Sequence, residues 1–391
     1  MKKQDVLTHY CAGCGLCHSA VNADHTEENG FFRPVIESRE INAFCEKICP
    51  AGGSHIEKLN PDNPWGDYLS YHCTWSKDAK VRHTASSGGT ITAILCYLLE
   101  NHVVDAVIHV GRSKENVVAT EVSISESADE VYQKMGSRYA ASSPLIRFLQ
   151  MIDANKKYAF VGKPCDIVAL NNYLERNQEI KKSIILKISF FCAGVPSKSA
   201  NERLLKRMGT NSDDCIRLDY RGNGWPGFAT AINKKGTPVQ ITYDESWGEI
   251  LGREVNRFCK FCVDGVGSFA DIACGDAWYK TSDNKPDFTE HEGRNITFAR
   301  TEIGQDVINK CLANGYLVEM EYDINELQYV QQHQFSRRTQ VYNRIMGLKL
   351  CHRDYPYFNL KELREFSMKL PVSAKLRITL GTIKRILTGK M

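Results

Sequence analysis

Three cysteines near the start of the sequence, Cys11, Cys14 and Cys17, stand three residues apart in the segment CAGCGLCH. With small residues between them, they direct three thiolates at one face of a tight turn. Three thiolates do not complete a four-ligand site, so the fold of this region depends on a ligand from elsewhere in the chain. The chain has 15 cysteines, and its first residues, MKKQDVLTHYCAGC, lack the apolar segment and cleavage site of a signal peptide. We therefore expect a cytoplasmic protein without disulfides, in which clustered cysteines bind metal and scattered ones fill buried apolar space.

The spacing of this triplet is that of bacterial ferredoxins, in which a distant cysteine followed by proline completes the ligands of a 4Fe-4S cluster. The segment CEKICP supplies such a pair at Cys49-Pro50, with Cys45 as the reserve candidate. A structural zinc site is the alternative, but zinc sites generally use two separated pairs of cysteines. The spacing therefore predicts a 4Fe-4S cluster bound by the triplet and Cys49.

A second group of cysteines lies further along the chain. Cys259 and Cys262 form a C-x2-C, which fits zinc, a redox dithiol or coincidence, and Cys274 follows in the same segment. Cys165 and Cys192 each come where a predicted strand ends before a helix. Taken singly, each of these two favours a buried filler over a ligand. Together with the C-x2-C they could form a second four-thiolate site, which spacing alone does not establish.

The residue composition and the predicted secondary structure divide the chain into three parts. Residues 1–70 are dense in Cys, Gly, Pro and Asn, and LNPDNPWGDY (59–68) is typical of a linker. Residues 71–330 alternate predicted strands, such as VVDAVIHVGR, with predicted helices, which favours an α/β core with some parallel pairing. The segment 215–243 predicts antiparallel hairpin strands, so we expect a mixed sheet. Residues 331–391 are expected to be helical and are increasingly basic.

Two loops that precede predicted helices could bind phosphate groups. In SSGGTITAIL, two hydroxyls and two glycines come before a helix whose free N–H groups and dipole favour an anion. A simple helix cap by Ser86 or Ser87 is the alternative, and the residues alone slightly favour it. The second loop is KMGSRYAASSP (134–144), for which an exposed loop is the alternative. The candidate phosphate ligands are Ser86, Ser87, Gly88, Gly89, Lys134, Ser137, Arg138 and Ser142.

A third glycine-rich segment, GNGWPG (222–227), matches the G-x-G-x-x-G pattern of dinucleotide-binding proteins. That fingerprint has to open a helix. Here Pro226 interrupts the segment, and the following FATAINK predicts a strand. We therefore reject it as a nucleotide site.

Several motifs occur in a fixed order between residues 11 and 278. They are CAGCGLC, the Cys-Pro pair, ASSGG, GSRY, GKPCD, FFCAGVPS, GWPG and CKFCVDG…ADIACGDAW. Each is weak alone, but the ordered set resembles the beta-subunit family of coenzyme F-420 hydrogenases and dehydrogenases, which includes 7-hydroxymethyl chlorophyll a reductase. Beyond about residue 290 the resemblance has no specific motif.

The resemblance implies a mixed-sheet, FAD-binding α/β domain that follows a small ferredoxin-like segment. It also implies two 4Fe-4S clusters, and it turns SSGG and GSRY, including Tyr139, into contacts of the FAD phosphates and ring in place of a helix cap. Cys274 stays in doubt as a ligand. The second cluster would be held by Cys165, Cys192, Cys259 and Cys262.

The function implied is that of an iron–sulfur flavoprotein oxidoreductase. Electrons would pass between ferredoxin or a reduced deazaflavin (coenzyme F-420) and a substrate, with the N-terminal cluster on the entry side. His83, Lys163 and Asp166 are candidate proton donors because they lie in loops near the expected flavin. The residues do not name the substrate, for which a small molecule or a glycan precursor is expected. The alternatives are a non-catalytic electron-transfer subunit and a zinc-binding module without redox activity.

Charge and hydropathy bear on the partners. A formal net charge of +4 and the lack of a basic run interleaved with aromatics argue against nucleic acid. The longest apolar stretch, TITAILCYLL, is too short to span a bilayer. The tail VSAKLRITLGTIKRILTGKM predicts an amphipathic helix on an anionic membrane surface or partner, and a solvated terminal helix is the alternative. Its cations are Lys375, Arg377, Lys384, Arg385 and Lys390.

Overall fold

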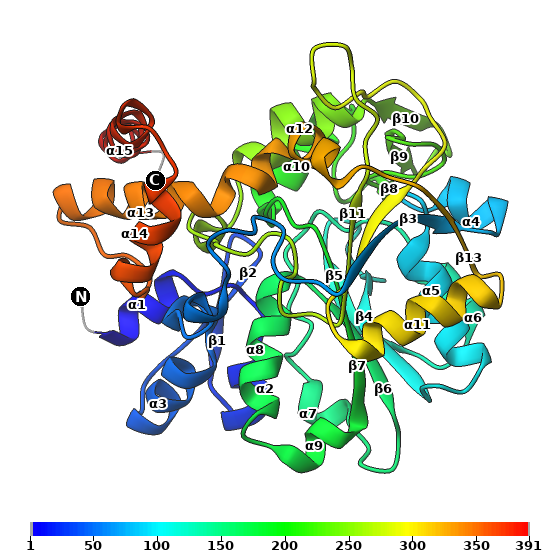
Figure 1. The fold of residues 1–391 in the computed structure, drawn as a ribbon, viewed down its shortest axis with the longest axis horizontal. Coiled ribbons are helices and arrows are strands. Elements are labelled where there is room, and N and C mark those ends of the chain that lie inside the picture. Colours follow the sequence, from blue (N-terminus) through cyan, green and yellow to red (C-terminus); the bar gives the residue numbers. More distant parts are fainter. Residues whose placement is uncertain (1–2, 390–391) are drawn as a thin grey trace.

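The main sheet is built around four short apolar segments that become its central strands. The computed structural model describes residues 3–389, and its eight-stranded sheet has the order β13-β3-β12-β11-β7-β6-β4-β5 (Figure 1). The central strands β11, β7, β6 and β4 pair in parallel, and the flanking strands are antiparallel. The expected mixed sheet is thus confirmed. The strands are β3 (Ser70–Ser76), β4 (Ala106–Arg112), β5 (Thr120–Ser125), β6 (Tyr158–Gly162), β7 (Ile184–Phe190), β11 (Ile272–Asp276), β12 (Asn295–Ala299) and β13 (Leu317–Met320).

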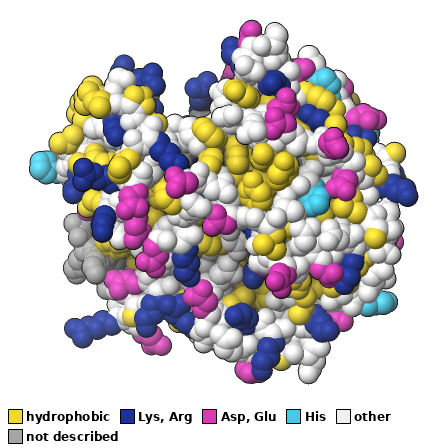
Figure 2. Space-filling model, in the orientation of Figure 1, with side chains coloured by type: hydrophobic (Ala, Val, Ile, Leu, Met, Phe, Trp, Pro, Cys, Tyr) yellow, Lys and Arg dark blue, Asp and Glu magenta, His cyan; other side chains and the backbone are white. Residues whose placement is uncertain are grey.

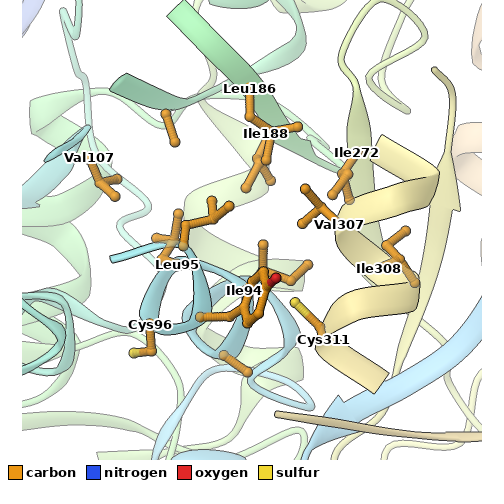
Figure 3. Close-up of a cluster of buried hydrophobic side chains, with 14 of the residues drawn as sticks. Ile94, Leu95, Cys96, Val107, Leu186, Ile188, Ile272, Val307, Ile308 and Cys311 are labelled. Carbon is orange, nitrogen blue, oxygen red and sulfur yellow. The ribbon is translucent and has the colours of Figure 1, made fainter. Parts of the chain in front are cut away.

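Side chains alternate along the central strands and build a core on each face of the sheet. Val107 and Leu186 pack on one face against α5 (Thr90–Glu100) and α11 (Glu302–Ala313), as Figure 3 shows. Ile108, which follows Val107 in β4, packs on the opposite face against α7 (Phe148–Met151) and α8 (Pro164–Leu174). Helices on both faces explain why these strands read as continuous apolar runs instead of alternating with polar residues.

The hairpin strands predicted within residues 215–243 are present but do not belong to the main sheet. They form a separate antiparallel sheet of order β10-β9-β8. The mixed character of the main sheet comes instead from antiparallel strands such as β3 and β12. The strands of this sheet are β8 (Cys215–Asp219), β9 (Ala229–Asn233) and β10 (Pro238–Ile241).

The helix after SSGG begins later than the serine-cap interpretation requires. Its N-cap is Gly89, in the left-handed region at φ 74°, and no side chain caps the helix. The Ser86 hydroxyl accepts a hydrogen bond from the Ser137 backbone N–H, and Ser87 Oγ donates to the Arg294 carbonyl at 3.2 Å. The cap prediction was therefore wrong, and both hydroxyls lie outside the helix.

Residues from both ends of the described chain share one buried cluster. Leu7 and Tyr10 pack with Phe261, Val341 and Leu363. Figure 1 shows α1 (Lys3–His9) beside α13 (Gln332–Leu350) and α14 (Leu360–Met368). The N-terminal part also contains more regular structure than its sequence suggested, since it has three short helices and a two-stranded hairpin. These elements are α1 (Lys3–His9), α2 (Leu16–Val21), β1 (His25–Glu28), β2 (Phe31–Pro34) and α3 (Arg39–Ile48).

The C-terminal part is helical, as expected, and the segment of basic residues forms its last helix. Lys390 of that predicted amphipathic helix lies outside the described residues. Within residues 3–389, no helix combines the length and hydropathy that a transmembrane segment needs. The remaining helices include α4 (Ala79–Thr84), α6 (Ala128–Lys134), α9 (Gln178–Ser183), α10 (Lys198–Arg207), α12 (Leu327–Val330), α13 (Gln332–Leu350), α14 (Leu360–Met368), α15 (Val372–Leu387) and the 3-10 turn η5 (Arg257–Lys260).

Candidate functional site

Four N-terminal cysteines come together between α2 and the end of α3. The thiol of Cys49, the C-cap residue of α3, interacts with those of Cys11, Cys14 and Cys17. Burial raises the pKa of the Cys14 and Cys49 thiols well above its ordinary value, and the neighbouring cysteines raise it further. Cys45 lies one turn earlier in α3, and its thiol forms a hydrogen bond with Cys17. This arrangement favours Cys49 over Cys45 as the fourth ligand.

The triplet can make its turn because Gly15 has no side chain. Gly15 is the N-cap of α2 at φ 83°, a conformation that L-residues rarely adopt. A Cβ atom there would also approach Ile146 Cα to 2.8 Å. The same packing brings the Cys14 carbonyl to the Leu145 N–H at 2.9 Å. The N-terminal segment is thereby attached directly to the loop that follows the GSRY motif.

The other four predicted ligands also come together, although up to 97 residues separate them along the chain. Cys165 opens α8, Cys192 follows β7, and Cys259 and Cys262 lie in and just after η5. The thiol of Cys192 interacts with each of the other three. Burial raises the pKa of Cys259 to about 12 and that of Cys262 to about 11. These thiols must lose their protons to bind metal, because the thiolate is the ligand.

Each quartet supplies four thiols, the donor set of a 4Fe-4S cluster. All 15 cysteines are free thiols. Within the described residues, no three His, Cys, Asp or Glu side chains are placed to hold a single metal ion. A cube-shaped cluster binds each thiolate through a different iron atom, so its ligands need not meet at one point. Cys274 lines the cavity described below; its buried thiol lies 3.7 Å from Thr297 Oγ1, and no other cysteine is among the groups that shift its pKa.

A buried ion pair lies between the two quartets. Lys163 Nζ is 2.8 Å from Asp166 Oδ2 and donates to Ser142 Oγ, also at 2.8 Å. Burial lowers the pKa of Lys163, but Asp166, Cys165 and Cys192 together outweigh this effect and the net shift is upward. Burial raises the pKa of Asp166, and Lys163 only partly opposes it. The Asp166 carboxylate acts on the thiols of Cys14, Cys165 and Cys192, so it lies near both quartets.

A cavity of about 340 Å³ opens beside this ion pair and is lined by Cys192 of the second quartet. Of the predicted phosphate ligands, only Gly88 is absent from its wall. A Cβ atom on Gly88 would lie 2.9 Å from Arg294 Cα, so this glycine serves close packing of the backbone. His83 is exposed on α4 and does not line the cavity. The predicted residues on the wall are Ser86, Ser87, Gly89, Lys134, Ser137, Arg138, Tyr139, Ser142, Lys163 and Asp166.

Arg138 presents an unpaired donor at the cavity. Its Nη2 donates to the Leu218 carbonyl at 3.0 Å and its Nε to the Ser137 carbonyl at 3.1 Å, but its buried Nη1 has no partner. The guanidinium also lies over the Tyr220 ring. Burial lowers the pKa of Arg138. A buried cation with a free N–H group is a suitable ligand for a phosphate oxygen.

The other end of the cavity was not predicted and is aromatic. Arg221 forms two hydrogen bonds with Asp276, at 3.0 and 3.1 Å, and its guanidinium lies over the neighbouring rings of Tyr243 and Trp278. Trp225 Nε1 donates to the same carboxylate at 2.8 Å. Trp225 lies within GNGWPG and β9 follows it, so rejecting that segment as a helix-opening motif was correct. The motifs GWPG and CGDAW, which contain Trp225, Asp276 and Trp278, could have indicated this end of the cavity from the sequence.

The comparisons with known proteins agree with this arrangement of motifs. The family model "Coenzyme F420 hydrogenase/dehydrogenase, beta subunit N-term" matches residues 71–150, and its C-terminal counterpart matches residues 155–324. The chain belongs to this family. Both cavity loops lie in the first matched region, and all four cysteines of the second quartet lie in the second. The N-terminal quartet and α13 lie outside both regions.

Two relatives and one solved structure illustrate the likeness. An uncharacterized protein of Methanocaldococcus jannaschii is 24% identical over 83% of this chain and 92% of its own length. The coenzyme F420 hydrogenase subunit beta of Methanococcus voltae is 25% identical over 66% of this chain and 87% of its own. A chain of the F420-reducing NiFe hydrogenase complex of Methanosarcina barkeri covers 73% of this fold with a TM-score of 0.56 at 18% identity, and 96% of that chain is matched.

Proposed function

We propose that the chain is an iron–sulfur flavoprotein oxidoreductase that holds FAD in the cavity and a 4Fe-4S cluster on each cysteine quartet. The observation that carries this proposal is that the two cysteine quartets and the cavity lie next to one another. Asp166 interacts with Cys14 of the N-terminal quartet and with Cys165 and Cys192 of the second, and Cys192 lines the cavity. When bound, the clusters would carry single electrons and the flavin one or two, which suits exchange between one- and two-electron donors.

The chain's own residues have distinct roles in this proposal. Ser86, Ser87, Ser137 and Arg138 bind the phosphate groups, since they form a wall of hydroxyls, N–H groups and one buried cation. Lys163 and Asp166 hold a proton at the cavity wall, where the exposed His83 cannot act. Arg221 and the aromatic rings around it orient a planar ring system. The bidentate pairing of Arg221 with Asp276 keeps this end rigid.

The electron donor is proposed to be ferredoxin or reduced coenzyme F420, and the acceptor a small molecule or glycan precursor, in the cytoplasm. The relative from Methanococcus voltae is named as a hydrogenase subunit, which supports a second proposal, an electron-transfer subunit within a larger complex. Anaerobic reduction of the bound flavin by either carrier would support both proposals. Steady turnover of an added acceptor by the chain alone would favour the enzyme. Carrier-dependent reduction of the flavin without turnover of an acceptor would favour the electron-transfer subunit.

Loss of the Arg138 guanidinium should weaken FAD binding about tenfold or more, since hydrogen bonds to charged groups contribute about 1.5–3 kcal/mol. The measurement is FAD and iron per chain after anaerobic purification of Arg138→Gln. FAD should fall while iron stays at about eight atoms per chain, as expected for two 4Fe-4S clusters. The exposed Arg147 offers a matched control, Arg147→Gln, which should retain both. A wild-type chain with zinc in place of iron and no flavin would refute the proposed function.

We also propose that α15 rests on an anionic membrane surface. Val372, Leu376, Leu380 and Leu387 share one side of the helix and are 58–79% exposed, while Thr382 on the opposite side is buried. In Figure 2, basic side chains lie beside hydrophobic ones in the upper left region occupied by α15 in Figure 1. An exposed apolar stripe flanked by cations and free of acids suits the plane of an anionic bilayer.

The membrane proposal predicts that Leu376→Ser/Leu380→Ser reduces co-sedimentation with vesicles about tenfold or more, because each buried Leu contributes about 1.5–3 kcal/mol. The vesicles are equal mixtures of phosphatidylcholine and phosphatidylserine, with pure phosphatidylcholine for comparison. Leu69→Ser/Ile216→Ser, at sites with 59% and 56% exposure elsewhere on the surface, is the control. Equal sedimentation of all three proteins would contradict the proposal, and binding to neither vesicle would leave α15 as a solvated helix.

A further inference from the structure

Arg337 of α13 is a buried cation that none of the functional assignments above has used. It is 5% exposed, and its Nη2 donates to the Ala193 carbonyl at 2.8 Å, next to Cys192. Its Nε has no hydrogen-bond partner. Among residues 3–389, no carboxylate forms an ion pair with it. A buried, uncompensated guanidinium is costly, so its position next to the second quartet requires an explanation.

The backbone around Arg337 is shaped to admit it. A Cβ atom on Gly265 would lie 2.9 Å from Arg337 Nε and 2.1 Å from Gln334 Oε1, so α13 can approach here only because residue 265 is a glycine. The Gly265 carbonyl accepts a hydrogen bond from the Cys192 N–H at 2.8 Å. Arg337, Gly265 and Cys192 therefore form one packed unit.

The charge of Arg337 acts on three of the four thiols of the second quartet. It lowers the pKa of Cys192, Cys259 and Cys262 against the raising effect of burial. The Asp264 carboxylate accepts hydrogen bonds from the Val266 and Ser268 N–H groups and the Ser268 hydroxyl. It raises the pKa of Cys262, but Arg337 has the larger effect on that thiol, so the positive charge prevails there.

We infer that Arg337 sets the reduction potential of the cluster proposed for Cys165, Cys192, Cys259 and Cys262, as a positioning residue supplied by the C-terminal helices. This inference rests on the proposed function. A cluster with four thiolates gains negative charge on reduction, and a fixed cation in a poorly solvated site stabilises that charge. Net charge and hydrogen bonding are among the factors that tune iron–sulfur potentials, and Arg337 offers both a charge and a free N–H donor.

The test is potentiometric titration, followed by electron paramagnetic resonance, of the full chain and two variants. Arg337→Gln removes the charge and should shift the one-electron reduction equilibrium of one cluster at least tenfold toward the oxidised form, which is 59 mV. Arg337→Lys keeps the charge and should shift it by less than half as much. The other cluster should keep its potential in both variants.

Arg300 provides a control because it is partly buried, donates to backbone carbonyls and has an unpaired Nε, and no cysteine is among the groups that shift its pKa. Arg300→Gln should leave both potentials unchanged. Unchanged potentials in Arg337→Gln with full iron would overturn the inference, as would equal shifts in the Gln and Lys variants. Absence of iron from the second quartet of the wild-type chain would instead refute the proposed function.

Discussion

Replacement of Cys49 by alanine is expected to remove about half of the bound iron, which is one 4Fe-4S cluster of two. The reason is that the Cys49 thiol interacts electrostatically with all three members of the triplet, and Cys49 belongs to the Cys-Pro pair that the ferredoxin spacing requires. The expected result is a loss of about four iron atoms per chain, measured by iron analysis after anaerobic purification. FAD content should be unchanged, because Cys49 does not line the cavity.

The control for this prediction is Cys45→Ala. Cys45 is buried in α3, one turn before Cys49, and its thiol forms a hydrogen bond with Cys17. The Cys45→Ala protein should retain all of its iron. If it loses the cluster while Cys49→Ala keeps it, the ligand assignment is reversed. If neither substitution lowers the iron content, no N-terminal cluster of this kind exists.

Replacement of Lys163 by methionine is expected to lower the free energy of unfolding by about 3–5 kcal/mol, the usual effect of removing one partner of a buried ion pair. Methionine preserves much of the side-chain volume but leaves the Asp166 carboxylate, which is 1% exposed, without its counter-charge. Asp166 Oδ1 already lacks a hydrogen-bond partner, and Oδ2 would keep only the backbone N–H of residue 163, at 2.9 Å, which carries no charge. Urea denaturation under anaerobic conditions measures the loss.

Two further variants separate the ion pair from other effects of this substitution. Lys58→Met removes a surface pair with Glu175, in which both side chains are 51% exposed, and should cost less than about 1 kcal/mol. The double variant Lys163→Met/Asp166→Asn removes both charges of this pair. The side-chain oxygen of the introduced asparagine can still accept the hydrogen bond from the backbone N–H of residue 163, so the double variant should recover much of the free energy of unfolding. A double variant as unstable as Lys163→Met would show that the unpaired charge is not the cause.

Local patterns predicted the parts of the fold and site that depend on neighbouring residues. The strand, loop and helix around GKPCD were predicted because an apolar run, a proline at the first helical turn and a helical segment follow one another within residues 158–174. Residues of both the SSGG and the GSRY loop line the cavity. Their hydroxyls and glycines before a helix could be recognised locally as a candidate anion site, which stays a prediction. The helix cap failed because Ser86 forms a hydrogen bond with the distant Ser137 backbone, which propensity cannot show.

The parts that were missed depend on contacts between distant residues. Arg221 and Asp276 are 55 positions apart, and neither has a local pattern that indicates pairing. Arg337 was assigned to a separate helical tail, because the sequence does not show that α13 packs against Gly265. The division at residues 70 and 330 stays a prediction, although Leu7, Phe261 and Leu363 from all three parts share one buried cluster.

That shared cluster also determines how late in translation the packing around the N-terminal thiols can be completed. Leu7 and Tyr10 pack against Val341 and Leu363, which the ribosome adds more than 300 residues later. At about 5–20 residues per second, the N-terminal thiols wait on the order of 20–70 seconds for the helices that pack beside them. During that interval they are open both to oxidation and to the cellular machinery that delivers iron and sulfide. Slow elongation under air should therefore harm this protein more than one whose metal ligands and covering helices are translated together.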